Sequence, residues 1–360
     1  MITNQCSETI HPAVLTQSGG GPSTGGFALL PNHTRNLTVG PDWQGRVWGR
    51  TNCSFNLHGT GPSKEGGIDG SGKSCNTGDC LGVLDCKQSG QTPVTLSEFT
   101  LSSSSGQAFY DISLVDGYNL PLAIVLLSGG NDVFDEIPPN LTNPSCVGTG
   151  ALLAAEGYDP YNGTSPIFLG TNASFPLPFD KRASLKSLSR WCPWDLQLQP
   201  PSKPGNGVYP YPDDHIQRPL FDPCYSACAK GNQPKDCCTG DYDDPTKCKP
   251  GLYSRNAKLA CPDAYSYAYD DKSSTFTVPS GSGFEVVFCP GGRSTNIFNT
   301  MPDQIKQLST TGKVDLQSLK NQGQTSEALR RIRLAGGWIM LGVLTAAWIG
   351  FSSELIEMAS

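Results

Sequence analysis

Fourteen cysteines constrain this 360-residue chain more than any other feature of its sequence. Their number is even, several are closely spaced and none forms a C-x-x-C pair, so they indicate disulfide bonds rather than a zinc or redox site. Apolar residues make up 37% of the chain, below the roughly 45–50% of an ordinary globular domain. Crosslinks must therefore help to hold the fold, and we expect an oxidising compartment.

Six N-x-S/T sequons also fit a secreted glycoprotein. Asn52 is the doubtful one because Cys53 is its middle residue, so we expect glycans on the other five: Asn32, Asn36, Asn140, Asn162 and Asn172. Cys6 follows Met1 so closely that no signal peptide is visible. We therefore expect the native chain to begin upstream of this Met1.

The charge and the histidines exclude several classes of function. A formal net charge of −6 argues against a nucleic-acid-binding surface. The four histidines are scattered in polar contexts without the spacing of metal ligands, and the glycine-rich runs lack the lysine of a phosphate-binding loop. We expect a monomer with no metal, no cofactor and no nucleic-acid partner.

Short β-prone runs separated by Gly, Pro and Asn turns indicate a mainly β fold. In the stretch 109–127, Ile112–Val115 and Leu122–Leu127 are predicted to be buried strands joined by a turn at Asp116-Gly117. Asp111 and Asp116 then stand at the two ends of the first strand. Buried strands rarely carry two acids without a use for them, although both could simply accept backbone hydrogen bonds.

Two further predicted strands carry charged residues. Arg46 and Arg50 have an even separation and so share one face of a strand. In Thr95–Leu101, Glu98 shares its face with Leu96 and Thr100. Between these strands the chain is rich in Cys and Gly and too poor in apolar residues to bury a core of its own.

Five motifs in a fixed order give the chain a resemblance to a known family. They are RVWGRTNC at 46–53, CNTGDCLGVLDC at 75–86, TLSE at 95–98, the stretch 109–127, and CPDAYSYAYDD at 261–271. Over residues 1–291 the chain resembles the thaumatin-like proteins, the osmotin and pathogenesis-related-5 group.

This resemblance implies a thaumatin-like β-sandwich with two disulfide-stapled, loop-rich excursions. The core sandwich would comprise 1–52, 97–146 and 262–291, the small excursion 53–96 and the larger excursion 147–261. The segments between Cys146 and Cys192 and between Cys192 and Cys224 are longer than is usual in the family, and their Pro-rich composition favours surface loops. The i,i+4 spacing of Cys224 and Cys228 predicts a short helix with both sulfurs on one face.

The resemblance also implies a disulfide pattern. Ala151 and Val278 stand where the family partners of Cys146 and Cys261 would be, so these two cysteines could pair with each other. The other six implied pairs are Cys6–Cys289, Cys53–Cys75, Cys80–Cys86, Cys192–Cys224, Cys228–Cys237 and Cys238–Cys248.

In antifungal members of the family an arginine, a glutamate and three aspartates line an acidic cleft. The matching positions are Arg46, Glu98, Asp111, Asp116 and one of the pair Asp270 and Asp271. Such carboxylates can hydrolyse a glycosidic bond, with Glu98 as the acid and Asp116 as the base or stabiliser, and Arg46 would keep one acid ionised. The same groups can instead bind sugar hydroxyls without catalysis.

We therefore expect an extracellular or cell-surface protein that binds cell-wall β-1,3-glucan and, on the catalytic interpretation, is an endo-β-1,3-glucanase. The alternative is a non-catalytic defence or interaction protein that perturbs membranes, binds a receptor or inhibits an enzyme. Which substrate features are recognised, and how the long inserts affect the cleft, stays open at this point.

The end of the chain has a different character. Residues 292–333 are predicted to be a polar linker, 334–351 an uncharged apolar helix long enough to span a membrane, and 352–360 a polar tail. The polar tail argues against a glycolipid-attachment signal. Three arginines precede the apolar stretch and two glutamates follow it, which leaves the orientation of a membrane anchor open.

Overall fold

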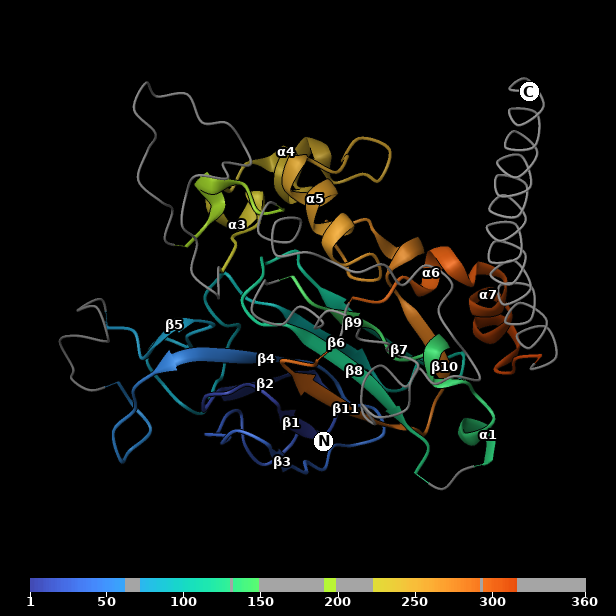
Figure 1. Ribbon diagram of the computed structural model, residues 1–360, viewed down its shortest axis with the longest axis horizontal. Coiled ribbons are helices and arrows are strands. Elements are labelled where there is room, and N and C mark those ends of the chain that lie inside the picture. The colour runs from blue at the N-terminus through green and yellow to red at the C-terminus, as the bar shows by residue number, and fades with distance from the viewer. Residues whose placement is uncertain (62–71, 130–131, 149–190, 199–222, 292–293, 316–360) are drawn as a thin grey trace, which may run out of the picture.

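Two β-sheets packed face to face form the centre of the protein (Figure 1). The computed structural model describes residues 1–61, 72–129, 132–148, 191–198, 223–291 and 294–315. The predictions for Asn162, Asn172, the segment 334–351 and the tail 352–360 lie outside these residues. Of the helices in the described ranges, none is both long and apolar enough to cross a membrane.

The first sheet has five strands in the order β3-β1-β11-β8-β9. Their bounds are β1 Ile2–Asn4, β3 His33–Arg35, β8 Leu122–Leu127, β9 Ser145–Cys146 and β11 Gly283–Phe288. Strand β1 runs parallel to β11, and the other neighbouring strands are antiparallel. The two ends of the 1–291 region therefore meet side by side in this sheet.

The second sheet has the order β10-β7-β6-β4-β2, with β5 paired to β4 beyond its main path. Its strands are β2 His11–Ser18, β4 Gln44–Cys53, β5 Cys75–Thr77, β6 Leu96–Thr100, β7 Gln107–Ser113 and β10 Phe276–Pro279. All of these pairs are antiparallel. The functional site described below lies on the outer face of this sheet.

The core lies between the sheets and follows from alternation along the strands. In β6, Phe99 points into the sandwich and is 5% exposed, whereas its neighbours Glu98 and Thr100 point outward. Phe99 and Tyr110 stack with 6.5 Å between ring centroids, and Tyr110 stacks on Phe276 at 5.5 Å. These rings link β6, β7 and β10 through one buried cluster.

Strand β7 begins earlier than the sequence indicates. It starts at Gln107 because Tyr110 and its neighbours pair with β6 on one side and β10 on the other. Asp111 therefore lies within the strand rather than at its end, while Asp116 lies in the following turn. That turn requires glycine: Gly117 has φ +106°, and a Cβ there would stand 2.4 Å from the Cys224 carbonyl oxygen.

The small excursion is held by buried polar groups as well as by disulfides. Arg50 is fully buried and donates to the carbonyl oxygens of His11, Val83 and Leu84. The carboxylate of Asp79 accepts from the backbone N–H groups of Ser74, Cys75 and Gly82. These bonds satisfy loop backbone that has no sheet partner.

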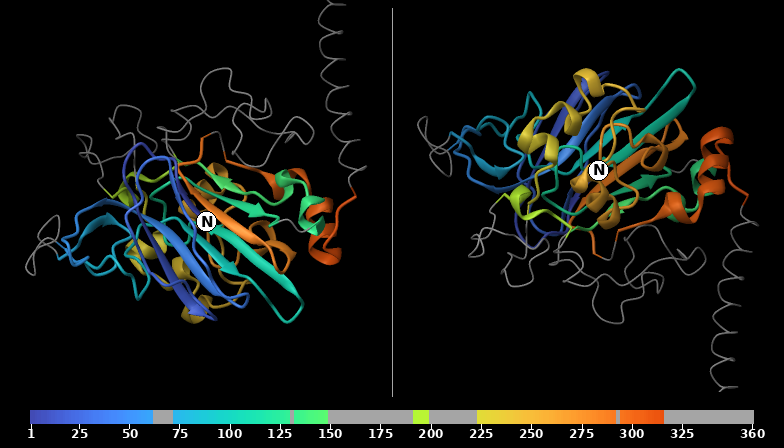
Figure 2. Two further views of the ribbon diagram at one scale, coloured as in Figure 1. Left: turned by 90° about the horizontal axis from the view of Figure 1, so that it is seen from below. Right: turned by 90° about the horizontal axis from the view of Figure 1, so that it is seen from above.

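The larger excursion supplies short helices that lie over the sandwich (Figures 1 and 2). They are α3 Ala227–Gly231, α4 Pro234–Cys237 and α5 Leu252–Ala260, with one-turn 3₁₀ helices at Trp194–Leu196 and Gly240–Tyr242; a further 3₁₀ helix, Asp271–Ser273, follows the excursion. The predicted helix from Cys224 to Cys228 is wrong at its start. Ser226 caps α3 by accepting from the N–H of Ala229, while Cys224 pairs as extended backbone with Tyr118.

Seven disulfides crosslink the described residues, and no cysteine among these residues is free. The bonds join Cys6–Cys289, Cys53–Cys75, Cys80–Cys86, Cys146–Cys261, Cys192–Cys224, Cys228–Cys237 and Cys238–Cys248. They are the pairs named above, including the one between Cys146 and Cys261. That bond ties β9 of the first sheet to the end of α5.

Part of the predicted linker is folded. Within 292–333 the structure has α6 Ile297–Thr300 and α7 Pro302–Thr311, which together cover the β10 side of the sandwich. Ile297, Met301 and Leu308 are each at most 2% exposed and belong to the main core. Ile297 lies in α6, Leu308 in α7 and Met301 between the two helices, and burial of these three side chains overrides the polar composition. The buried Asp263 carboxylate accepts from the N–H groups of Ile297 and Phe298 and so caps this segment.

The packing of the segment that contains α6 and α7 also tests the glycan expected on Asn140. Asn140, in the 3₁₀ helix Pro139–Leu141 that follows α1 Asp132–Asp135, is 1% exposed, and its amide donates to the Met301 sulfur at 3.8 Å. A glycan on Asn140 is therefore incompatible with this packing, contrary to the sequence-based expectation. Asn32 and Asn36 are exposed.

Candidate functional site

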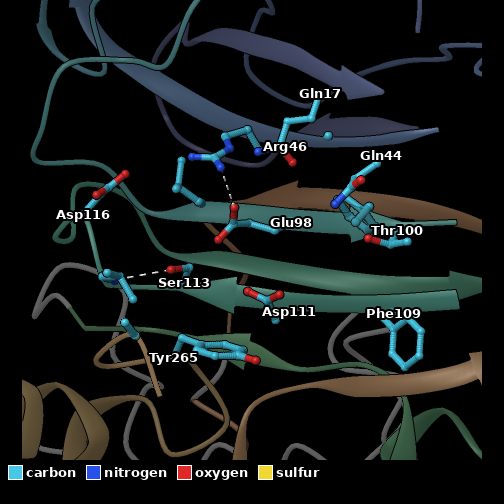
Figure 3. Close-up of a pocket in the computed structure, with 15 residues that line it drawn as sticks. Gln17, Gln44, Arg46, Glu98, Thr100, Phe109, Asp111, Ser113, Asp116 and Tyr265 are labelled. Carbon is cyan, nitrogen blue, oxygen red and sulfur yellow. Dashed lines mark hydrogen bonds and ion pairs between the residues drawn. The ribbon is translucent and has the colours of Figure 1, made fainter. Parts of the chain in front are cut away.

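A row of charged side chains crosses the outer face of the second sheet. Arg46 of β4 pairs directly with Glu98 of β6, and Glu98 pairs directly with Asp111 of β7. Directly opposed residues in antiparallel strands project to the same face with Cβ atoms about 4.5–5.5 Å apart. The three side chains therefore stand next to one another, and Asp116 approaches them from the turn after β7 (Figure 3). We call Arg46, Glu98 and Asp111 the charged row.

The charged row is only partly satisfied by its own contacts. Arg46 Nη2 lies 3.2 Å from Glu98 Oε1. Among the described residues, Arg46 Nε and Asp111 Oδ1 are buried without a hydrogen-bond partner. Unpaired buried polar atoms are costly. One buried donor and one buried acceptor of the charged row are thus unpaired among the described residues.

These side chains line a groove of about 420 Å³. Its floor is formed by β4, β6 and β7, and the segment before the 3₁₀ helix Asp271–Ser273 contributes Tyr265 and Ala268 to one wall. Tyr265 is held there because its backbone N–H bonds to Ile112 O and its carbonyl oxygen accepts from Leu114 N–H. The segment that follows the larger excursion is thereby fixed to the end of β7 beside the acids.

Burial raises the pKa of the Glu98 carboxyl. Arg46 opposes this rise, the nearby Asp116 adds to it, and a hydrogen bond with Ser113 opposes it again. The net direction is upward even though the guanidinium is in contact with the carboxylate. Glu98 therefore holds a proton to higher pH than an ordinary glutamate.

The pKa of Asp111 is raised further above its usual range. Burial is the largest cause, and the negative charge of Glu98 adds to it while Arg46 opposes it. The pKa of Asp116 is also raised by burial, against the effect of Arg46. Three carboxyls with raised pKa values therefore surround one guanidinium, and a carboxyl donates a hydrogen bond when protonated and accepts when ionised.

Asp270 and Asp271 have different positions. The Asp270 carboxylate pairs with Lys258 of α5 at 3.0 Å and accepts from Ser266 and Ser273, so it holds the wall together rather than lining the groove. Asp271 accepts from the Tyr265 hydroxyl at 2.9 Å and reaches the groove only through that ring. The expectation that Asp270 binds substrate is therefore not supported by its position.

Several groove residues were missed by sequence reasoning. They are Gln17, Gln44, Thr100, Phe109, Ser113 and Tyr265. Gln44, Thr100 and Phe109 each stand two residues from a member of the charged row along the same strand. Because alternate residues of a strand share one face, the positions two residues from Arg46, Glu98 and Asp111 could have been predicted from the sequence to lie on the same face.

The fold and the groove together define a disulfide-stapled β-sandwich protein with a carboxylate-lined cleft beside an excursion. The chain belongs to the thaumatin family, because the sequence model of the family "Thaumatin family" matches residues 4–290.

Known relatives of the chain agree with this assignment. The chain is 37% identical over 291 residues to "Pathogenesis-related thaumatin-like protein 3.5" of Cryptomeria japonica, covering 80% of this chain and 88% of that protein. It is 35% identical over 289 residues to "Pathogenesis-related protein 5" of Arabidopsis thaliana, covering 80% and 89%. A "PR5-like receptor kinase" of the same plant is 33% identical over 82% of this chain and 34% of that protein.

Proposed function

We propose that the groove binds a β-1,3-glucan of the cell wall. The observation that carries this proposal is the charged row with its unpaired Arg46 Nε and Asp111 Oδ1 at the floor of an open groove. A neutral sugar presents hydroxyls that donate to carboxylates and accept from a guanidinium at the same time.

The composition of the groove favours a neutral ligand over a basic one. Arg46 stands within the cluster of acids, where it would repel a cationic ligand, and burial disfavours the charged forms of Glu98 and Asp111. Gln17, Gln44 and Thr100 extend the lining with uncharged donors and acceptors. This set matches polyhydroxylated ligands.

Hydrolysis is the finer form of the proposal. A glycosidase needs one carboxyl that is protonated and one that is ionised. Glu98, with its raised pKa, suits the acid, and Asp116, which stands at the end of the site away from Gln44 and Thr100 in Figure 3, suits the base or the stabiliser of positive charge. Non-catalytic binding uses the same residues without proton transfer, so activity must be measured separately from binding.

The test uses the full chain with Glu98→Gln and, as matched control, Glu8→Gln at an exposed site away from the groove. Retention on insoluble linear β-1,3-glucan measures binding, and release of reducing sugar measures hydrolysis. A glycosidase loses about 10²-fold or more of its turnover in Glu98→Gln while still retaining glucan. Wild-type protein that neither binds nor cleaves the glucan would refute the proposal, and binding without release in every variant would leave a non-catalytic glucan-binding protein.

We also infer an extracellular or cell-surface location. Seven disulfides suit an oxidising compartment. The relative named as a receptor kinase fits a family in which this domain also occurs within a much longer chain. A membrane tether at 334–351 remains our prediction from the sequence, and a membrane-fractionation assay with and without detergent tests it.

A further inference from the structure

We propose that Gln44, Thr100 and Phe109 form a second sugar subsite beside the charged row and set how strongly affinity depends on glucan length. We call these three residues the neutral row. The inference rests on the proposed glucan binding and extends it to particular residues and to a direction along the groove.

The neutral row is a product of strand register. Gln44 of β4 pairs directly with Thr100 of β6, and Thr100 pairs directly with Phe109 of β7. Each residue lies two positions from its counterpart in the charged row, so the two rows share one face of the sheet about 6.6–6.8 Å apart. Figure 3 shows Gln44, Thr100 and Phe109 together at one end of the groove, with Gln17 nearby and Asp116 toward the other end.

On the opposite side of the charged row the floor of the groove is more deeply buried. The next row in register is Trp48, Leu96 and Ser113, whose exposed fractions are 0%, 3% and 2%. In the neutral row, by contrast, Gln44 is exposed and both Thr100 and Phe109 are partly exposed. A chain of sugars seated on the charged row therefore meets accessible floor on the side of the neutral row.

The chemistry of the neutral row suits a pyranose ring. The Gln44 amide oxygen accepts from the Ser18 hydroxyl at 3.2 Å, which leaves its NH₂ group to donate to a sugar hydroxyl. The Thr100 hydroxyl can donate or accept. Phe109 offers an aromatic face with apolar surface and no charge. None of the three side chains titrates, so their contribution to binding should not depend on pH.

The test measures affinity for β-1,3-gluco-oligosaccharides of two to six units by isothermal titration calorimetry. The variants are Gln44→Ala, Phe109→Ala and their combination, with Phe109→Tyr as the variant that keeps the aromatic face. Gln88→Ala, at an exposed site on the small excursion, is the matched control. Thermal midpoints near that of the wild type show that each variant is folded.

We expect the wild-type dissociation constant to fall as the oligomer lengthens. The double variant should lose about tenfold in affinity for the six-unit oligomer, because one hydrogen bond and an apolar contact together contribute about 1.4 kcal/mol, and much less for the two-unit oligomer. Phe109→Tyr and Gln88→Ala should behave as the wild type does, and the loss should be equal at about pH 5 and pH 8.

An equal loss at every length, or no loss, would overturn the subsite while leaving glucan binding intact. A loss that changes with pH would assign the effect to the charged row. If the wild type binds none of the oligomers, the proposed function itself fails and the subsite fails with it. Arg46→Met separates these cases, since it should weaken the binding of every length.

Discussion

Asp111 is a groove residue that we expect to lower the stability of the fold at neutral pH. Its Oδ1 is buried without a partner among the described residues, and Glu98 of β6 and Asp271 of the wall add negative charge nearby, opposed by Arg46 of β4. Because its pKa is raised on folding, its stabilising contribution is fully present below the ordinary pKa of 3.8 and is lost as pH rises through the folded value.

Asp111→Asn should therefore be more stable than the wild type at neutral pH. Asparagine removes the buried negative charge that Glu98 and Asp271 repel, and a gain of about 1 kcal/mol corresponds to about 2–4 °C in the thermal midpoint. Melting curves recorded by circular dichroism from about pH 3 to pH 8 should show the two proteins converging at the acid end. Asp241→Asn at an exposed site is the control, and an Asp111→Asn protein that is less stable at neutral pH would contradict this account.

Asp270 should behave in the opposite way. Its ion pair with Lys258 is largely buried, with side-chain exposures of 10% and 25%, and it also accepts from Ser266 and Ser273. Asp270→Ala should lower the free energy of unfolding by about 2–3 kcal/mol, near the lower end of the cost of breaking a buried ion pair. Urea denaturation measures this change. The affinity for glucan should stay within about twofold of the wild-type value. A large loss of affinity without a loss of stability would show that Asp270 binds the ligand after all.

Sequence reasoning at this scale distinguished Arg46, Glu98, Asp111 and Asp116 because each lies in a recognisable motif. It could not separate Asp270 from its neighbour, since two adjacent acids look alike until the position of Lys258 is known. The neutral row was missed because Gln, Thr and Phe carry no chemical signature in isolation.

At the scale of elements, α6 and α7 are the main departure from expectation. Their composition is polar, yet Ile297, Met301 and Leu308 recur at helical spacing and fill the core against β10. The spacing was present in the sequence, but three apolar residues in a polar stretch are too few to predict burial without knowing the surface that receives them.

Leu308→Ala should consequently destabilise the sandwich. Leu308 is 2% exposed, and truncating a buried leucine costs about 2–5 kcal/mol. Leu259→Ala is the matched control because Leu259 is 81% exposed, and it should change the free energy of unfolding by less than about 0.5 kcal/mol. Equal, small effects of both variants in urea denaturation would show that the segment is a linker after all.

At the scale of the whole molecule, the sandwich is held by crosslinks between distant segments. The Cys146–Cys261 bond spans 115 residues of sequence, whereas Cys228–Cys237 spans 9. If disulfides stabilise by restricting the unfolded chain, removing the longer crosslink should cost about 2 kcal/mol more than removing the shorter one. Urea denaturation of two double variants tests this: one with both Cys146 and Cys261 changed to Ser, the other with both Cys228 and Cys237 changed to Ser. A larger loss of unfolding free energy in the second variant would show that the disulfides stabilise mainly through local packing.

The overall architecture was accessible from sequence because its determinants are discrete: cysteine spacing, turn residues and family motifs. Which side chains line the groove together could not be predicted from the sequence, because this depends on which residues pair with each other across neighbouring strands. The register pairing Arg46 with Glu98 and Glu98 with Asp111 is set by packing on the far side of the sheet.

That register has a consequence for how such a groove can change over evolution. Glu98 and Phe99 are neighbours that face opposite sides of one strand, so inserting a single residue in β6 would direct the aromatic ring to solvent and the acid into the sandwich. Point substitutions at alternate positions escape this penalty. New ligand preferences in this fold are therefore expected to arise by exchanging outward-facing side chains or by lengthening surrounding loops, while the strand lengths stay fixed.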